Sequence, residues 1–302
     1  MLGLVEGCYF FDRFGDVYAV KGVVHPPGRV YAVPRIIDGV ETKNLQQSIC
    51  LAAEKNPSYV FQDPYLGRAV IAVPEPDVKQ PLYPSKRIKG PTDLVEAAKR
   101  LSSVLSDAGV DHGFSGSLLL GTADEKSDID IVIYGGEKEY QIIKQLRQRK
   151  ILQPVDMEVL EILAESRLDT PQSPPSIQTE AEKFLTGKYA KHLYTMKIVP
   201  KTFWETWEDT KVTPEGSVEM VVQVVDDSHG FYTPAKYVVR NVGEGLAVTE
   251  VISFRSRFSE MGVSGDRLLV KGLLEKVVKP GCIYHRVNVG LGVSDYIKPV
   301  NV

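Results

Sequence analysis

The stretch GFSGSLLLGTADEKSDIDIVIYG, residues 113–135, constrains the fold more than any other part of the chain. Its second half places two carboxylates, Asp128 and Asp130, at the start of a run of β-forming residues that ends at Tyr134. In a β-strand, residues two apart point to the same face of the sheet. We therefore expect the two carboxylates to project together from one face, while the isoleucines between and after them enter the core.

The spacing of these acids predicts a site for a divalent cation and a phosphate-bearing ligand. Mg²⁺ prefers a few carboxylate oxygens, together with water and substrate phosphates. Gly116 and Ser117, separated from Asp128 by ten intervening residues, predict a turn whose N–H groups and hydroxyl approach phosphates without an obstructing Cβ. Taken singly, an Asp-x-Asp sequence is typical of a solvated strand end and a Gly-Ser pair of a loop. Jointly they predict that Asp128 and Asp130 bind Mg²⁺ or Mn²⁺ and that Gly116 and Ser117 bind an NTP.

Helices are expected on both sides of this stretch. Asp93 is expected to cap the first helix, with Glu96 completing a capping box, and apolar residues recur on one face as far as Leu105. A strand near 113–120 is expected to lie beside the strand at 129–134, and a second helix follows over 139–148. The order helix, strand, strand, helix is that of a small α/β unit.

The complete spacing is Gly-Ser, three residues, Gly, five residues, and Ser-Asp-Ile-Asp before an apolar strand. It resembles the nucleotidyltransferase signature of the DNA polymerase beta superfamily. Nearly the whole chain also resembles a group of archaeal predicted nucleotidyltransferases, through stretches such as VKGVVHPPGRVYAVPR, FYTPAKYVV and FRSRFSE. The resemblance implies the nucleotidyltransferase fold and a metal–nucleotide site at the residues above. It implies no particular acceptor.

The superfamily pattern includes a third carboxylate on the next core strand, and here two interpretations are open. If QPVDMEVLEIL, residues 153–163, were a strand, Asp156 and Glu158 would share a face and supply it. The same residues fit a helix that Asp156 caps, which we favour. The third strand is then expected within 190–200, which contains no carboxylate. Two aspartates would remain, enough to hold a single cation.

The flanking regions are rich in β-forming residues. Residues 7–37 predict a β-meander, a helix is expected over 43–55, and the proline-rich segment 57–91 is expected to be a covering arm with one strand at 68–73. After a predicted helix near 157–167, the stretch LDTPQSPPSIQ, residues 168–178, predicts a linker or exposed loop.

The C-terminal part, residues 217–302, again shows dense strand patterns, and GDRLLVKG, residues 265–272, has the strand pattern of OB-like barrels. We therefore predict an α+β protein with three domains. These are a β-rich N-terminal region with its arm over 1–91, a nucleotidyltransferase domain over 92–200, and a β-rich C-terminal domain over 201–302.

Composition limits the partners. The net charge of −3 argues against a surface devoted to nucleic-acid phosphates, so long duplex DNA is not expected as a partner. No stretch approaches the roughly 18 consecutive apolar residues of a membrane span, and the first residues do not resemble a signal peptide. A cytoplasmic protein without a membrane partner is expected. The three scattered cysteines indicate neither a disulfide framework nor a zinc site.

These observations predict a metal-dependent enzyme that moves a nucleoside monophosphate from an NTP to a hydroxyl acceptor, which could be a small molecule, a protein or an RNA end. The alternative is a nucleotide-binding or RNA-associated module with the same fold and little catalysis. Geometry should separate them. A carboxylate near Asp128 and Asp130 would support the enzyme, whereas Tyr194 or His192 in that place would support the binding module.

Overall fold

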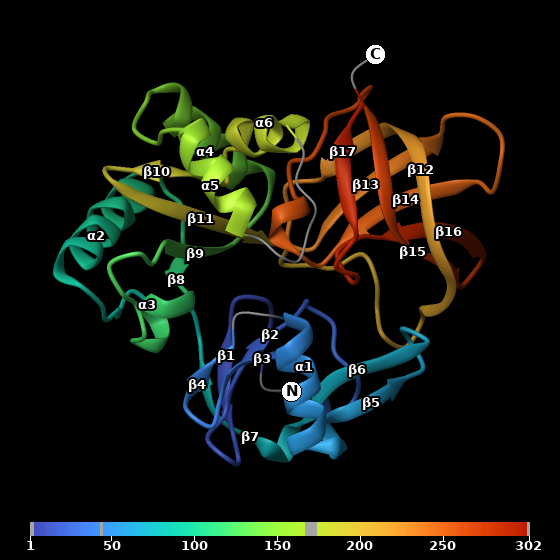
Figure 1. Ribbon diagram of the computed structural model, residues 1–302, viewed down its shortest axis with the longest axis horizontal. Coiled ribbons are helices and arrows are strands. Elements are labelled where there is room, and N and C mark those ends of the chain that lie inside the picture. The colour runs from blue at the N-terminus through green and yellow to red at the C-terminus, as the bar shows by residue number, and fades with distance from the viewer. Residues whose placement is uncertain (1–2, 43–44, 167–173, 301–302) are drawn as a thin grey trace. The chain divides into compact units, whose positions relative to one another are not determined.

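The computed structural model describes residues 3–42, 45–166 and 174–300. The chain divides into two compact units (Figure 1). Unit 1 comprises Met1–Tyr83, Thr202–Pro214 and Lys276–Ile283, and unit 2 comprises Pro84–Lys201, Glu215–Glu275 and Tyr284–Val302. Each unit is therefore assembled from three separate segments of the chain. The boundaries of the three domains stay a prediction.

No helix among the described residues is long and apolar enough to cross a membrane.

Unit 1 is built on a seven-stranded sheet in the order β5-β6-β3-β2-β1-β7, with β4 paired to β3. Its strands are β1 Tyr9–Asp12, β2 Val17–Val20, β3 Arg29–Ile37, β4 Val40–Glu41, β5 Val60–Asp63, β6 Arg68–Pro74 and β7 Val78–Leu82. The antiparallel β1, β2 and β3 confirm the meander predicted over 7–37. Helix α1, Leu45–Lys55, confirms the helix predicted over 43–55, of which residues 43 and 44 lie outside the described residues.

The covering arm predicted over 57–91 was wrong, because this segment supplies three strands of the sheet instead of one. Its prolines are compatible with strands because of where they lie. Pro57 and Pro76 are in short 3-10 helices, and Pro81 is in β7, a strand at the end of the sheet order. Proline lacks an N–H, and these positions do not require one for a continuous ladder.

A buried carboxylate joins the three segments of unit 1. Glu205 is 4% exposed; its carboxylate accepts a hydrogen bond of 2.5 Å from the Tyr65 hydroxyl and lies 3.1 Å from Lys279 Nζ. Nearby, Trp207 Nε1 donates to the Tyr31 hydroxyl at 3.2 Å. A buried charge requires such partners, so this cluster depends on all three segments being in place.

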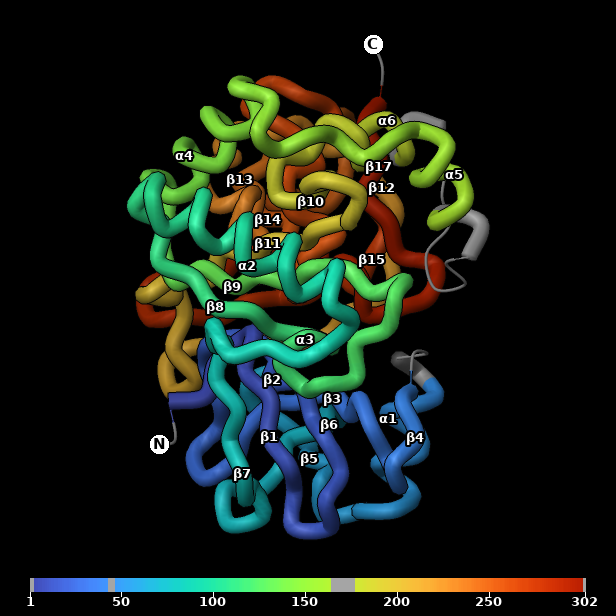
Figure 2. Tube along the Cα trace, turned by 90° about the vertical axis from the view of Figure 1, so that its left-hand side faces the viewer, coloured from blue at the N-terminus to red at the C-terminus, as the bar shows by residue number. Residues whose placement is uncertain are grey.

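Unit 2 contains a four-stranded sheet in the order β10-β11-β9-β8. Its strands are β8 Gly113–Phe114, β9 Ile129–Tyr134, β10 Thr186–Tyr189 and β11 His192–Val199. β9 and β11 are parallel, and the other two pairings are antiparallel. Helices α2, Thr92–Asp107, and α4, Glu137–Gln148, contribute buried apolar residues to the same core as the isoleucines of β9. The backbone traces of α2, α4 and β9 can be followed in Figure 2.

Several local predictions in this sheet need correction. Asp93 does not cap α2; Pro91 holds the cap position, and Asp93 lies in the first turn, paired with Lys191. The strand predicted over 113–120 is two residues long and gives way to the short helix α3, Gly116–Leu120. A short apolar run fits helix or strand equally well, and here the positive φ of Gly116, +58°, turns the chain into the helix.

Two helices follow α4. Helix α5, Met157–Ser166, confirms the favoured helical interpretation of 153–163. Of the loop predicted over 168–178, residues 168–173 lie outside the described residues, and the rest was wrong because helix α6 spans Pro174–Glu182. Prolines are compatible with the first turn of a helix, whose N–H groups have no intrahelical partner.

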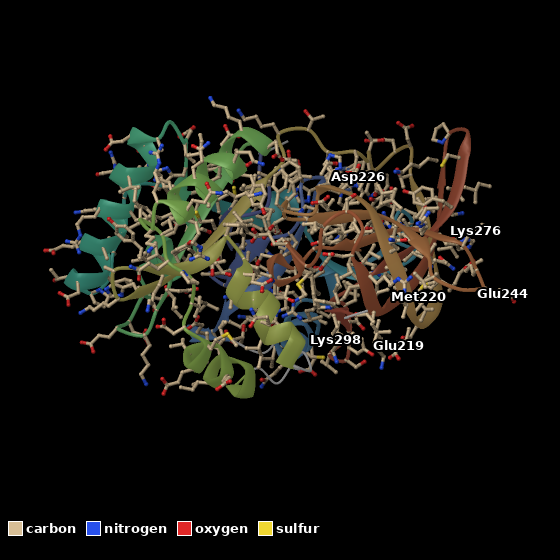
Figure 3. The ribbon with its side chains drawn as sticks, turned by 90° about the horizontal axis from the view of Figure 1, so that it is seen from above. Glu219, Met220, Asp226, Glu244, Lys276 and Lys298 are labelled. Atoms are coloured by element: carbon tan, nitrogen blue, oxygen red, sulfur yellow. The ribbon has the colours of Figure 1, made fainter. Side chains whose placement is uncertain are left out.

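The remaining strands form a six-stranded sheet in the order β12-β13-β14-β16-β15-β17. An additional pairing joins β12, the first strand of this order, to β15, the fifth. The strands are β12 Lys211–His229, β13 Ala235–Asn241, β14 Val248–Ser253, β15 Arg267–Lys279, β16 Cys282–Asn288 and β17 Tyr296–Pro299. The Tyr296 hydroxyl donates to Glu219 Oε2 at 2.5 Å, and Lys298 Nζ lies 4.1 Å from the centroid of the Tyr296 ring, so Glu219 and Lys298 lie close together (Figure 3).

The two sheets of unit 2 meet through aromatic and charged contacts. Tyr140 of α4 stacks on Phe231 with ring centroids 4.4 Å apart, and its hydroxyl donates to Glu260 Oε1 at 2.9 Å. The same carboxylate accepts the backbone N–H groups of Phe184 and Leu185, each at 3.0 Å. These contacts fix the segment before β10 against the six-stranded sheet.

Candidate functional site

Asp128 and Asp130 lie where the sequence predicted them, at the start of a strand. Asp128 immediately precedes β9, and Asp130 is its second residue. Both are half-buried, whereas Ile129, Ile131 and Ile133 are completely buried in the core of the four-stranded sheet. The alternation therefore turns the two carboxylates to the face opposite the core.

Gly116 lies directly against Asp130. Its φ of +58° is in the left-handed region, and a Cβ at this position would lie 2.8 Å from Asp130 Cγ and 3.0 Å from Asp130 Cβ. The preceding N–H, of Ser115, donates to the backbone carbonyl of Asp130 at 3.0 Å. A side chain at position 116 would therefore displace the carboxylate, so glycine is needed here for both space and conformation.

Ser117 is the second residue of α3 and is half-buried. Its carbonyl accepts the N–H groups of Gly121 and Thr122, at 2.8 and 3.0 Å, which close this short helix. The structure thus brings Gly116 and Ser117 beside the aspartates, as the first turn of a helix instead of the predicted turn between two strands.

The neighbouring strand β11 places a hydroxyl and an ammonium group on the same face as the two acids. In the parallel register Thr195 is opposite Asp130, and Lys197 is opposite Val132. The Thr195 hydroxyl lies 3.4 Å from Asp128 Oδ2, a long hydrogen bond in which the hydroxyl donates. Sequence reasoning missed both residues, although the alternation of β11 already separated them from the buried Met196 and Ile198.

Neither of the residues expected for a binding module occupies this position. Tyr194 is 1% exposed and belongs to the core on the other face, where its hydroxyl donates to the Phe184 carbonyl at 3.1 Å. His192 is the first residue of β11, and burial, followed by the nearby Lys191 charge, lowers the pKa of its ring.

The candidates for a third carboxylate lie in and before α5. Asp156 precedes the helix, and its carboxylate accepts a hydrogen bond from Lys188 Nζ. Glu158 is exposed in the first turn of the helix. Among the described residues, no group of three or more His, Cys, Asp or Glu side chains is arranged to hold a metal ion. Asp128 and Asp130 are hard oxygen donors on one face, a donor set that fits Mg²⁺ or Mn²⁺ with water and phosphate oxygens completing its coordination.

The part of the chain that contains Asp128 and Asp130 is similar to a known protein family. Residues 94–175 match the family model described as a nucleotidyltransferase domain. The chain carries a nucleotidyltransferase domain. The matched range contains all four predicted site residues, and it confirms the resemblance to nucleotidyltransferases and the assignment of a transferase activity.

A whole-length relative also exists in an archaeon. An uncharacterized protein of Methanocaldococcus jannaschii is 26% identical to this chain, and the alignment covers 97% of the chain and 96% of that protein. The similarity therefore extends through the nucleotidyltransferase domain and the β-rich regions on both sides of it. No solved structure matched the chain.

Proposed function

We propose that the protein transfers a nucleoside monophosphate from an NTP to a hydroxyl acceptor and releases pyrophosphate. The observation that carries this proposal is the contact of Gly116 with the carboxylate of Asp130, within the matched nucleotidyltransferase domain. It puts a backbone that can approach phosphates beside two carboxylates that can hold a cation.

Each of the four predicted site residues has a proposed role in this reaction. Asp128 and Asp130 hold Mg²⁺ or Mn²⁺, which supplies positive charge to the phosphate oxygens when it is bound. Gly116 and Ser117 hold the phosphates of the NTP. The acceptor oxygen forms a bond to the α-phosphorus, the bond from that phosphorus to the bridging oxygen breaks, pyrophosphate leaves and the hydroxyl proton passes to solvent.

The acceptor is proposed to be a small molecule, a protein or an RNA end. Long duplex DNA is not expected in this role, because the net charge of −3 does not suit a surface that must neutralise many phosphates. Duplex binding should therefore be weak at physiological salt.

A second candidate function is nucleotide binding without transfer. It is favoured by one observation, the presence of Thr195 instead of a carboxylate opposite Asp130. The two candidates share the metal–nucleotide site and differ in whether the NTP is cleaved.

One experiment separates them. The protein is incubated with Mg²⁺, NTPs labelled at either the α- or the γ-phosphate, and cellular RNA, protein or small-molecule fractions. Transfer of the α-label alone, lost when Asp128→Asn and Asp130→Asn are combined, is the expected result. Calorimetric NTP binding without label transfer to any fraction would favour the binding module. Equal NTP affinity in the double variant would contradict the assigned site.

A further inference from the structure

We propose that Lys197 binds the phosphate groups of the NTP, so that β11 supplies the cationic part of the site. This inference rests on the proposed function. Its starting point is the face to which Lys197 belongs. Met196 and Ile198, on either side of it, are 1% and 0% exposed within the core, and strand alternation directs the side chain between them to the opposite face.

The register fixes which residues share that face. Thr195 is opposite Asp130, and its hydroxyl contact with Asp128 at 3.4 Å shows that this face of β11 looks onto the same side as the two acids. Lys197 is two residues further along, opposite Val132. It is therefore the diagonal neighbour of Asp130 across the two parallel strands.

The separation suits a shared ligand. Strands lie about 4.8 Å apart and rise about 3.3 Å per residue, which gives roughly 8 Å between the Cα atoms of Asp130 and Lys197. The four-carbon stem of lysine can bring its ammonium group within reach of a ligand held at the carboxylates. Lys197 is half-buried, so its charge is screened less than that of a fully exposed lysine.

The negative charge of the triphosphate is a second reason to expect a cationic side chain near Asp128 and Asp130. One divalent ion neutralises the two carboxylates and leaves the negative charge of the triphosphate unbalanced. An ammonium group binds phosphate oxygens as a point charge and needs no fixed angle of approach. Lys197 can thus hold the phosphates during binding and offset the charge that builds up on pyrophosphate as it leaves.

The test measures NTP and nucleoside affinities side by side by calorimetry in the presence of Mg²⁺. Lys197→Met removes the charge and keeps the length of the side chain, and Lys197→Arg keeps the charge. We expect Lys197→Met to weaken NTP binding about 10- to 100-fold, the loss of a hydrogen bond between charged groups, and to leave nucleoside binding unchanged. Lys197→Arg should keep most of the NTP affinity.

The matched control is Lys271→Met, at another half-buried lysine on a strand of unit 2, which should bind NTP like the wild type. Wild-type NTP affinity in Lys197→Met would overturn the proposal, and so would an equal loss of NTP and nucleoside affinity, which would indicate a structural role. A raised KM for a phosphate-bearing acceptor with NTP affinity unchanged would also overturn it. If the wild type itself binds no NTP, the proposed function fails first, which is a different result.

Discussion

β9 and β11 are parallel neighbours that bury the same kind of residue and present opposite chemistry. On the core face both strands insert large apolar side chains, with Ile131 of β9 paired in register with Met196 of β11. On the other face Asp130 of β9 and Asp128 just before the strand supply two carboxylates, and β11 carries a hydroxyl and an ammonium group. The comparison shows that the packed face of each strand requires apolar residues, whereas Asp130, Thr195 and Lys197 on the other face supply polar and charged groups that complement one another.

The largest expected effect comes from Gly116→Ala, which disturbs the acidic strand alone. A methyl group there would meet the Asp130 carboxylate, and the φ of +58° adds a penalty of about 1–2 kcal/mol for a residue with a Cβ. We expect Mg²⁺-dependent NTP binding and label transfer to fall at least about 100-fold, as in other sites where a reacting group is misplaced by about 1 Å.

Gly121→Ala is the control for that variant. Gly121 also has a positive φ, +76°, yet the nearest atoms to an added Cβ belong to Lys89, at 3.6 Å or more. It should lose similar stability in thermal unfolding and keep NTP binding. Equal losses of binding in both variants would show that backbone strain, and not the contact with Asp130, controls the acidic strand.

A smaller effect is expected from Thr195→Val, which changes the chemistry of β11 without changing its shape. The hydroxyl contact with Asp128 is long, at 3.4 Å, so its loss should weaken Mg²⁺-dependent binding by about 2- to 10-fold. Thr195→Ser should bind like the wild type. A Mg²⁺ titration of NTP binding measures both, and an unchanged midpoint in Thr195→Val would mean that the acids of β9 are positioned without help from β11.

The smallest effect concerns the opposite side of β9, where His112 precedes β8. His112 is buried, its Nδ1 donates to the Val110 carbonyl at 2.9 Å, and its Nε2 lies 2.7 Å from Lys86 Nζ. Burial, with the Lys86 charge beside it, lowers the pKa of the ring below its ordinary value of 6.5. The unfolded chain thus binds the proton more readily, so this contribution to stability is present above about pH 6.5 and is lost as pH falls through the lowered pKa.

Melting temperatures measured from about pH 7.5 to about pH 5 test this assignment. The wild type should lose more stability than His112→Gln over that range, whereas label transfer at neutral pH should be the same in both. His192→Gln is the control, because His192 is the first residue of β11 and its ring also has a lowered pKa. A loss of transfer in His112→Gln at neutral pH would extend the functional site to β8.

The sequence predicted β9 well and β11 only in part, for a physical reason. The period-two alternation of β9 and the turn residues before it are local signals, so its bounds and its acidic face could be derived from the sequence. That Thr195 lies opposite Asp130 depends on the register between two strands far apart in the chain, which no local pattern encodes. The strand predicted over 113–120 was wrong for another reason. Leu118 and its neighbours, which form α3, are an apolar run too short to distinguish helix from strand.

Because unit 1 is assembled from three separate segments of the chain, it can be completed only late in translation. Its buried Glu205 comes from one segment and is bound by Tyr65 from an earlier segment and by Lys279 from a later one. During translation the N-terminal sheet must wait for about 200 further residues before this cluster can close, roughly 10–40 s at a synthesis rate of about 5–20 residues per second. A nascent chain that ends anywhere before Lys279 therefore exposes an incomplete unit 1 to chaperones and proteases, even after its nucleotidyltransferase domain has left the ribosome.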